Sequence, residues 1–388
     1  MVGPGVLYRR SRTSGTGEER ENFVCSAAMK PITSKNYLLT AGFALMALLG
    51  FALRTDACTA FQFRAGENRY LAKSHDFMMG EGLLHVNRRG IAKRSALTPK
   101  TSFEWVSRFG SVTYNQFGRE MPNGGMNEAG LVVEMLWLNE TKYAPVDERH
   151  EIELLQWVQY QLDTAKTVGE VIASDRSLRI VAGPAPVHFF VADREGGAAV
   201  LELLEGKLRV HRGADLPVPV LANDVYAKCV EALAVGSMPG TAPLSSFDRF
   251  QTLAAQTDKF EPKQGQPQSF AFAALQRVRH PQYTQWQVVY DPAGARLWLR
   301  RQVDDTVREV DFGKCDFSPI AAPLAADLTK PGALAWVICT PELNRAVIAR
   351  SYAATPFLRD VPAADLEMVA TFPESFQPVA TTDLRKLN

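Results

Sequence analysis

The chain has 388 residues and a formal net charge of +1 at pH 7, so no overall field favours nucleic acid, anionic lipid or a strongly charged substrate. Its content of 46% apolar and 22% charged residues is typical of a globular protein. No basic block with interleaved aromatic residues indicates nucleic-acid binding. The five cysteines lack the spacing of zinc ligands, which argues against a structural metal site.

Residues 37–53 form an uninterrupted run of apolar or small residues, followed by RTDA at residues 54–57. This is the layout of a secretory signal peptide, with small residues Thr55 and Ala57 just before the cleavage point. We therefore expect export to a bacterial periplasm and cleavage after Ala57. Cys58 then becomes the first residue of the mature protein.

Two other interpretations of the apolar run remain open. An uncleaved run would anchor the protein in the membrane. A lipoprotein would carry an acyl group on Cys58, but that signal normally has an aliphatic residue where Thr55 stands. The stretch MKPITSK at residues 29–35 makes a conventional signal start, so we expect translation to begin at Met29, with a disordered leader as the alternative. The predicted division is a leader and signal peptide over residues 1–57 and one catalytic domain over residues 58–388.

The pattern after Cys58 is that of strands. Residues 59–64 and 69–74 predict two strands joined by a turn at residues 65–68, and this hairpin brings KSHD at residues 73–76 back beside residue 58. Further strands are predicted at residues 110–117 and 131–138, with a turn-rich loop at residues 121–130.

The second half of the chain mixes helices and hairpins. Helical spacing runs over residues 151–162, and a capping box at Thr167 opens a short helix. Helices are also predicted around Cys229 and from Ser245. Hairpins are predicted at residues 188–204 and 285–300. Because strands come in runs with helices grouped between them, we expect antiparallel sheets with helices stacked outside.

An N-terminal cysteine carries a nucleophile and a base on one residue. A thiol has a reference pKa of about 8.5 and must lose its proton to attack, while an α-amino group with a reference pKa of about 7.7–8.0 accepts a proton near neutrality. A carboxylate must hold that amine, and Asp76 is the candidate. The plainer interpretations are an incidental Cys58 and an Asp76 that caps a turn.

Several stretches of the chain together resemble one known family. They are CT at residues 58–59, KSHD at 73–76, GMNEAGL at 125–131, LANDVY at 221–226, SFDRF at 246–250 and YTQW at 283–286. This pattern resembles the choloylglycine hydrolase family of N-terminal nucleophile hydrolases, which includes bile salt hydrolases and penicillin V acylases. The resemblance runs from Cys58 to about residue 300, and GSVTYNQFGRE at residues 110–120 is closest to the Gram-negative, acylase-like branch.

The resemblance implies a four-layer αββα sandwich of two antiparallel sheets, the α+β fold of N-terminal nucleophile hydrolases. It implies Cys58 as nucleophile with its own amine as base, Asp76 as the residue that orients the amine, and Asn223 as an oxyanion-hole donor. Arg249 matches a second arginine near the nucleophile, although a surface ion pair is the plainer interpretation.

The chain departs from the family at two positions. Lys73 stands where many members have Arg, which keeps the charge but loses the planar fork of donors. Trp137 stands where bile salt hydrolases have an asparagine, and we expect its backbone N–H to serve an oxyanion and its indole to line the acyl pocket, with core packing as the plainer alternative. Asn139 would need a two-residue shift to take that role.

Other residues near Asp76 have less defined roles. Phe77, Met78 and Met79 form either an apolar wall of the substrate site or plain core. The mechanism requires neither His75 nor His85, so we expect both to be non-catalytic.

The resemblance implies hydrolysis of a linear amide C–N bond through an S-acyl intermediate, without a metal or an organic cofactor. Penicillin V and N-acyl homoserine lactones are favoured as substrates over conjugated bile salts, given Lys73 and Trp137. The partner is a small-molecule amide rather than a nucleic acid, and a homo-oligomer, tetrameric as in relatives, is compatible with the chain. The alternative is a catalytically inactive, membrane-tethered binding protein of the same fold.

Overall fold

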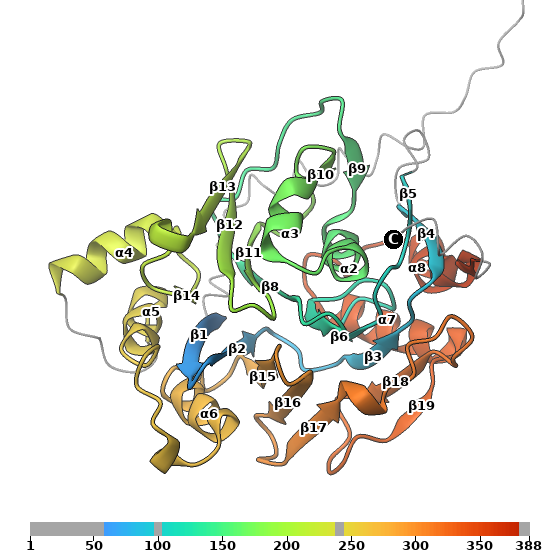
Figure 1. Ribbon diagram of the computed structural model, residues 1–388. Helices are drawn as coiled ribbons and strands as arrows, with labels where there is room; N and C mark the ends of the chain where they lie inside the picture. Colours follow the sequence, from blue (N-terminus) through green and yellow to red (C-terminus); the bar gives the residue numbers. More distant parts are fainter. Residues whose placement is uncertain (1–57, 97–102, 237–243, 380–388) are drawn as a thin grey trace, which may run out of the picture. The chain divides into compact units, whose positions relative to one another are not determined.

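A computed structural model describes residues 58–96, 103–236 and 244–379 (Figure 1). The predicted signal peptide, its cleavage site and Met29 lie outside these residues. No helix in the described ranges is long and apolar enough to cross a membrane.

Two large sheets form the centre of the fold, and every pairing within them is antiparallel. The first sheet has the order β14 (Val220–Leu221), β1 (Thr59–Ala65), β2 (Asn68–Asp76), β15 (Thr284–Asp291), β16 (Arg296–Arg301), β17 (Val307–Asp311). The second has the order β13 (Lys207–Arg212), β12 (Ala198–Leu204), β11 (Val187–Ala192), β8 (Val132–Trp137), β7 (Gly124–Asn127), β6 (Ser111–Asn115), β3 (Leu83–Asn87), β18 (Leu324–Asp327), β19 (Trp336–Ile338).

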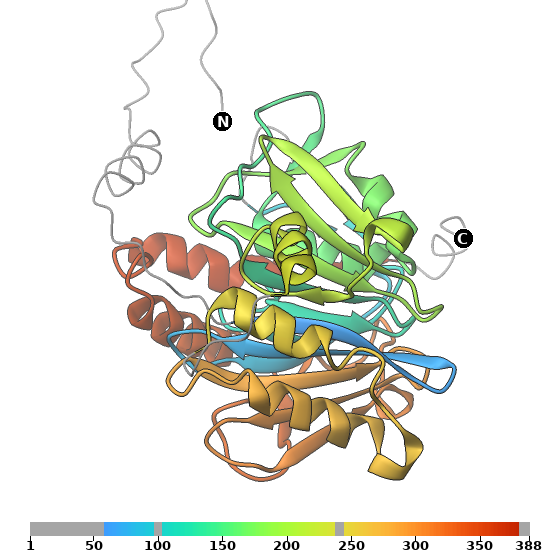
Figure 2. The ribbon, with the colours of Figure 1, turned by 90° about the vertical axis from the view of Figure 1, so that its left-hand side faces the viewer.

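Helices cover the outer faces of both sheets. On the first sheet, α5 (Ser246–Ala254) and α6 (Pro267–Arg277) contact β1, β2, β14 and β15, and Figure 2 shows these yellow helices against the blue strands. On the second sheet, α2 (Leu154–Thr164) contacts β7 and β8, with α3 (Val168–Ser174) beside it in Figure 1. The predicted αββα sandwich is therefore confirmed.

Smaller elements flank these layers. Two short strands form a parallel pair. The last described strand joins two early strands in a three-stranded sheet. The remaining elements are β9 (His150–Ile152), β10 (Leu178–Ile180), β4 (Ile91–Arg94), β5 (Glu104–Val106), β20 (Gln377–Pro378), α4 (Tyr226–Val235), α7 (Pro341–Ala354) and α8 (Ala363–Thr371).

Alternation along β8 separates the two apolar cores. Val132 packs in the core between the sheets, whereas Val133, the next residue, packs under α2 in the outer core. Successive side chains of a strand point to opposite faces, so a fully buried strand supplies both cores. This explains why residues 131–138 are apolar on both faces, with Glu134 as the exception.

The predicted first hairpin is confirmed in its register. Thr59 lies opposite Ser74 across β1 and β2. Cys58, one residue before Thr59, therefore lies at the end of β2 beside His75 and Asp76. The hairpins at residues 188–204 and 285–300 are also confirmed, as β11–β12 and β15–β16.

Two local predictions were wrong. Residues 121–130 were expected to be a loop, but β7 lies within them, because Gly124 and Gly125 are needed where neighbouring chain approaches closely. A Cβ on Gly125 would collide with the backbone carbonyl of Val112. The helix expected from residue 151 begins at Leu154, because residues 150–152 pair with β10 as a strand.

The predicted short helix after Thr167 is confirmed as α3. The Thr167 side chain accepts from the N–H of Glu170 at 3.2 Å. The Glu170 carboxylate accepts from the N–H of Lys166 at 2.7 Å, one residue earlier than a strict capping box requires.

The cysteines within the described ranges are unpaired. Cys58, Cys229, Cys315 and Cys339 are all free, so no disulfide joins two of the last three, a possibility that the sequence left open.

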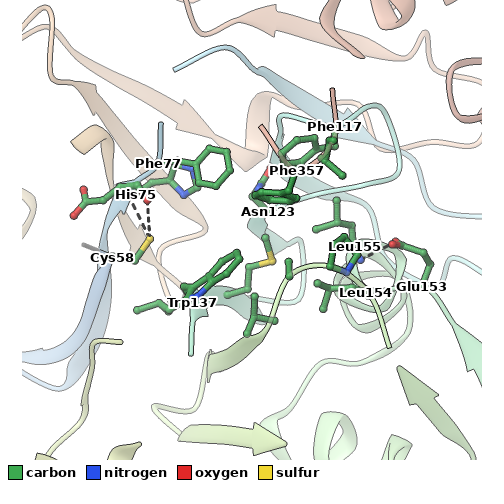
Figure 3. Close-up of a pocket in the computed structure, with 18 of the residues that line it drawn as sticks. Cys58, His75, Phe77, Phe117, Asn123, Trp137, Glu153, Leu154, Leu155 and Phe357 are labelled. Carbon is green, nitrogen blue, oxygen red and sulfur yellow. Dashed lines mark hydrogen bonds between the residues drawn. The ribbon is translucent and has the colours of Figure 1, made fainter. Parts of the chain in front are cut away.

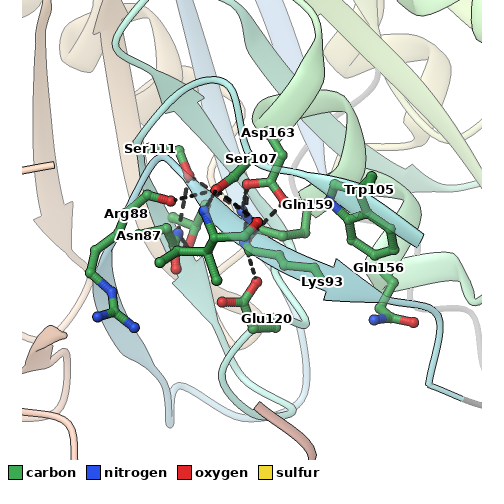
Figure 4. Close-up of polar contacts among 12 residues, drawn as sticks. Asn87, Arg88, Lys93, Trp105, Ser107, Ser111, Glu120, Gln156, Gln159 and Asp163 are labelled. Atoms are coloured by element: carbon green, nitrogen blue, oxygen red, sulfur yellow. Dashed lines mark hydrogen bonds and ion pairs between the residues drawn. The ribbon is translucent and has the colours of Figure 1, made fainter. Parts of the chain in front are cut away.

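A buried ion cluster ties the edge strands to α2 (Figure 4). The Lys93 ammonium lies 2.6 Å from the Glu120 carboxylate and 2.9 Å from that of Asp163. Trp105 donates its indole N–H to Asp163 at 2.8 Å, and Gln159 donates to the same carboxylate at 2.8 Å. Because every partner is buried or nearly so, the cluster is stable only as a complete set.

Two glycine substitutions should have opposite effects. Gly125→Ala forces a Cβ into backbone atoms of β6 and should lower the free energy of unfolding by at least about 2 kcal/mol. Gly169→Ala, inside α3 with no atom nearer than 3.8 Å to the new Cβ, should raise it by about 0.5–1 kcal/mol. Urea unfolding of the mature protein measures both, and equal effects would contradict the role of Gly125.

Candidate active site

Cys58 lies at the junction of β1 and β2 and lines a cavity between the two sheets (Figure 3). Its Sγ lies 3.4 Å from both the backbone nitrogen and the backbone oxygen of Asp76. Burial raises the pKa of the thiol to about 11, against the opposing influence of the Lys73 charge. A thiol in this setting stays protonated at neutral pH unless a base is added beside it.

Asp76 offers one unused carboxylate oxygen next to that thiol. Ser74 donates its hydroxyl to Oδ1 at 2.8 Å. Oδ2 is buried and accepts no hydrogen bond from any described residue. Burial raises the pKa of Asp76 to about 6, with hydrogen bonds from Thr284 and Ser74 opposing the rise. The carboxylate is therefore ionised at neutral pH and has room for one more donor.

Arg249 and Asn223 come from separate segments and meet behind Cys58. Arg249 donates Nη2–H to Asn223 Oδ1 at 2.7 Å and Nε–H to Thr59 Oγ1 at 3.0 Å. Since a guanidinium only donates, it fixes which end of the Asn223 amide is oxygen. The Asn223 NH₂ therefore faces Trp137, whose carbonyl accepts one of its two hydrogens at 2.9 Å.

A buried histidine holds the residue before Asn223. His188 Nε2 lies 2.8 Å from the carbonyl oxygen of Ala222, and Nδ1 lies 3.2 Å from the carboxylate of Glu202. Burial opposes ionisation of Glu202, but hydrogen bonds from His188 and His211 lower its pKa to about 2. The ring of His188 is therefore held between Glu202 and the backbone of Ala222.

The Trp137 backbone faces the same side as the Asn223 amide. Leu138 donates its N–H to Pro186 on the β11 side at 3.0 Å. The backbone N–H and C=O groups of successive residues in a strand point to opposite sides, so those of Trp137 point away from β11. Its indole lines the cavity and donates to the side chain of Asn139 at 2.7 Å, so the Asn139 amide is tied to the ring.

Lys73 joins the two sheets through an ion pair. Its buried ammonium donates to Glu134 at 2.8 Å, to the hydroxyl of Tyr114 at 2.9 Å and to the carbonyl of Met135 at 2.8 Å. Tyr290 and Tyr114 both donate to the same Glu134 carboxylate. These three acceptors match the three N–H groups of an ammonium. Lys73 therefore acts on Cys58 through its charge rather than by touching a substrate.

The cavity has a volume of about 130 Å³ and is mainly apolar and aromatic. It includes the expected Phe77 and Trp137, whereas Met78 and Met79 are not among its lining residues. The other lining residues are Cys58, His75, Asp76, Phe117, Asn123, Met135, Leu136, Glu153, Leu154, Leu155, Gly183, Pro184, Ala185, Val187, Tyr352, Phe357 and Leu358.

Sequence reasoning missed the wall formed by Tyr352, Phe357 and Leu358. These residues belong to α7 and the segment after it, beyond the region of resemblance. The ring of Trp137 lies 6.2 Å from that of Phe357, and that of Phe117 lies 5.8 Å from that of Tyr352. The apolar pair at residues 357–358, just after a helix, was the one available signal.

His75 and His85, which we expected to be non-catalytic, are neutral. His75 lines the cavity and stacks on Trp286 with ring centroids 4.3 Å apart, and burial holds its pKa well below the usual value. Burial lowers the pKa of His85 to about 3. Within the described ranges, no group of three or more His, Cys, Asp or Glu side chains is arranged to hold a metal ion.

Comparison with known proteins agrees with the resemblance. The model of linear amide C–N hydrolases, choloylglycine hydrolase family, matches residues 58–229. The chain is similar to this family over those residues. It is an enzyme that hydrolyses linear amide C–N bonds, and the alternative of an inactive binding protein is not favoured.

Individual relatives agree with this assignment. The chain is 24% identical over 274 residues to the penicillin V acylase of Pectobacterium atrosepticum, covering 58% of this chain and 72% of the relative. A penicillin V acylase structure from Agrobacterium tumefaciens superposes with a TM-score of 0.60 at 25% identity, over 70% of this chain and 91% of that one. A conjugated bile acid hydrolase variant from Clostridium perfringens, at 16% identity and a TM-score of 0.55 over 67% and 94% of the two chains, shares the fold.

The Lys73–Glu134 pair should behave as one unit. Lys73→Met leaves the buried Glu134 carboxylate without its cation and should lower the free energy of unfolding by about 3–5 kcal/mol. Lys73→Met combined with Glu134→Leu should recover much of that loss, because no buried charge remains. Denaturant unfolding checks this, with Lys142→Met on the surface as control. A Lys73→Met variant as stable as the wild type would contradict the pairing.

Proposed function

We propose that this enzyme is an exported N-terminal cysteine hydrolase of N-acyl amides, matured by cleavage after Ala57. The observation that carries the proposal is the pairing of Cys58 with the buried, unpartnered Oδ2 of Asp76 at one end of an apolar cavity. A buried polar atom without a partner is costly. The α-amino group released by cleavage is the donor that would satisfy it.

Cleavage would be an activation step as well as a sorting step. In the uncut chain the nitrogen of Cys58 is an amide and cannot accept a proton, and burial raises the pKa of the thiol to about 11. In the mature chain the free amine takes the thiol proton, and the Asp76 carboxylate holds the resulting ammonium. The thiolate is then ready to attack.

The reaction follows from these groups. The thiolate attacks the amide carbon, and the Asn223 amide with the Trp137 N–H stabilises the oxyanion. Collapse breaks the C–N bond while the ammonium gives its proton to the leaving nitrogen. Water, deprotonated by the same amine, attacks the S-acyl group and releases the acid and the thiol. Arg249 orients Asn223 throughout.

The residues that line the cavity suggest which kind of acyl group the substrate carries. Aromatic walls from Phe77, Phe117 and Trp137 suit a phenoxyacetyl group or an alkyl chain. The names of two relatives support penicillin V as the first candidate substrate. N-acyl homoserine lactones come next in this proposal, and conjugated bile salts after them. Trp137 supports this order, whereas Lys73, which donates to protein acceptors, no longer bears on it.

Maturation is tested by the N-terminus of the exported protein. We expect the mature chain to begin at Cys58 and to hydrolyse penicillin V or N-acyl homoserine lactones. Cys58→Ser should reduce turnover by at least about a thousandfold without unfolding the protein. A variant whose cleavage is blocked by Ala57→Leu should be as inactive. An active chain that starts elsewhere would overturn the proposal.

His188 should support turnover through the position of Asn223. His188→Phe removes the hydrogen bond to Ala222 and should lower kcat by about tenfold to a hundredfold with little change in KM. His211→Phe is the matched control, because His211 contacts the same Glu202 but not Ala222, and its effect on kcat should be much smaller. Equal losses in the two variants would show that His188 acts only through Glu202.

A further inference from the structure

The cavity that begins at Cys58 ends at a carboxylate. Figure 3 shows Cys58 at one end and Glu153 at the other, with Trp137 and Phe357 between them. Apart from Asp76 beside the nucleophile, Glu153 is the charged side chain among the described residues that line the cavity. A carboxylate facing an otherwise apolar pocket is costly unless a ligand pairs with it.

Capping alone does not account for a glutamate at this position. Glu153 is the N-cap of α2, and its Oε2 accepts from the N–H of Leu155 at 3.0 Å. Serine, threonine, aspartate and asparagine are the preferred N-cap residues, and each would cap the helix at lower desolvation cost. What the longer glutamate adds is a charge on the cavity wall.

The lining of the cavity includes a second polar side chain. Tyr352 lines the cavity, and the charge of Glu153 contributes, after burial, to raising the pKa of this tyrosine to about 12. Burial also raises the pKa of Glu153, although backbone N–H groups of α2 oppose the rise. The cavity lining therefore combines an acceptor, at the end away from Cys58, with a second polar group and several aromatic rings.

We propose that Glu153 makes the enzyme prefer N-acyl amides whose acyl group carries a hydrogen-bond donor, above all an ammonium group, at the end remote from the scissile bond. The inference rests on the proposed function in placing the acyl group in this cavity. Tyr352 assists by hydrogen bonding to the same group. A charge-assisted hydrogen bond between a carboxylate and an ammonium is stronger than one between neutral groups.

Binding of free carboxylic acids tests this without turnover. Straight-chain acids and their ω-amino counterparts of equal length are titrated calorimetrically into the mature protein, and the ratio of the two dissociation constants is the readout. Glu153→Gln should shift that ratio by about tenfold against the ω-amino acid. Tyr352→Phe should shift it in the same direction by less.

Matched variants separate this role from helix capping. Glu153→Ser keeps a preferred N-cap but removes the carboxylate, so it should shift the ratio as Glu153→Gln does. Glu148→Gln, on an exposed loop, should leave the ratio unchanged. An unaltered ratio in the two Glu153 variants, or no binding of either acid, would overturn the inference.

The same series distinguishes this inference from the proposed function. Failure of the mature protein to hydrolyse the corresponding N-acyl amides, with the ratio still dependent on Glu153, would reject the catalytic proposal alone. Hydrolysis through Cys58 with no dependence of the ratio on Glu153 would reject the inference alone.

Discussion

The ion pair between Lys73 and Glu134 is the constraint on which the rest of the site depends. Lys73 lies on β2 of one sheet and Glu134 on β8 of the other, and both side chains are fully buried. Tyr290 and Tyr114 bond to the same carboxylate from the two sheets. Removing one charge leaves the other unpaired in the interior. The ion pair therefore favours one placement of the two sheets against each other.

The placement of the two sheets sets the surroundings of Cys58. The β1–β2 hairpin fixes the position of Cys58 relative to the first sheet, while β8 fixes the Trp137 backbone in the second sheet. Asn223 bridges the two, because its NH₂ donates to Trp137 and its oxygen accepts from Arg249, which also bonds to Thr59. These hydrogen bonds hold the Asn223 amide and the Trp137 backbone in fixed positions relative to Thr59, the residue after Cys58.

The cavity adds a second constraint, of shape and polarity. Its walls include β8, the start of α2 and the segment after α7, so distant parts of the chain shape it. Aromatic rings line it, and Glu153 and Tyr352 add two polar groups to its walls. Specificity within the family would then be altered by changing this wall, without touching Cys58 or Asp76.

The sequence by itself determined the local elements and the chemical class. Alternation and turn residues located most strands, and a cysteine after a signal pattern, with Asp76 in a predicted hairpin, indicated the chemistry. Those signals are local, or depend on one short hairpin. The strand β7 was not predicted because its glycines are typical of a turn. Only close packing explains them, of Gly124 against Glu134 and of Gly125 against Val112.

Only the tertiary structure decided the partners of Lys73 and the far end of the cavity. Glu134 lies 61 residues from Lys73 in the sequence, and no periodicity links them. Tyr352 and Phe357 reach the site from beyond the region of resemblance, through contacts between distant segments. Pairing of buried charges and closure of a pocket depend on which surfaces the packed sheets bring together, and that information is absent from any local window of the sequence.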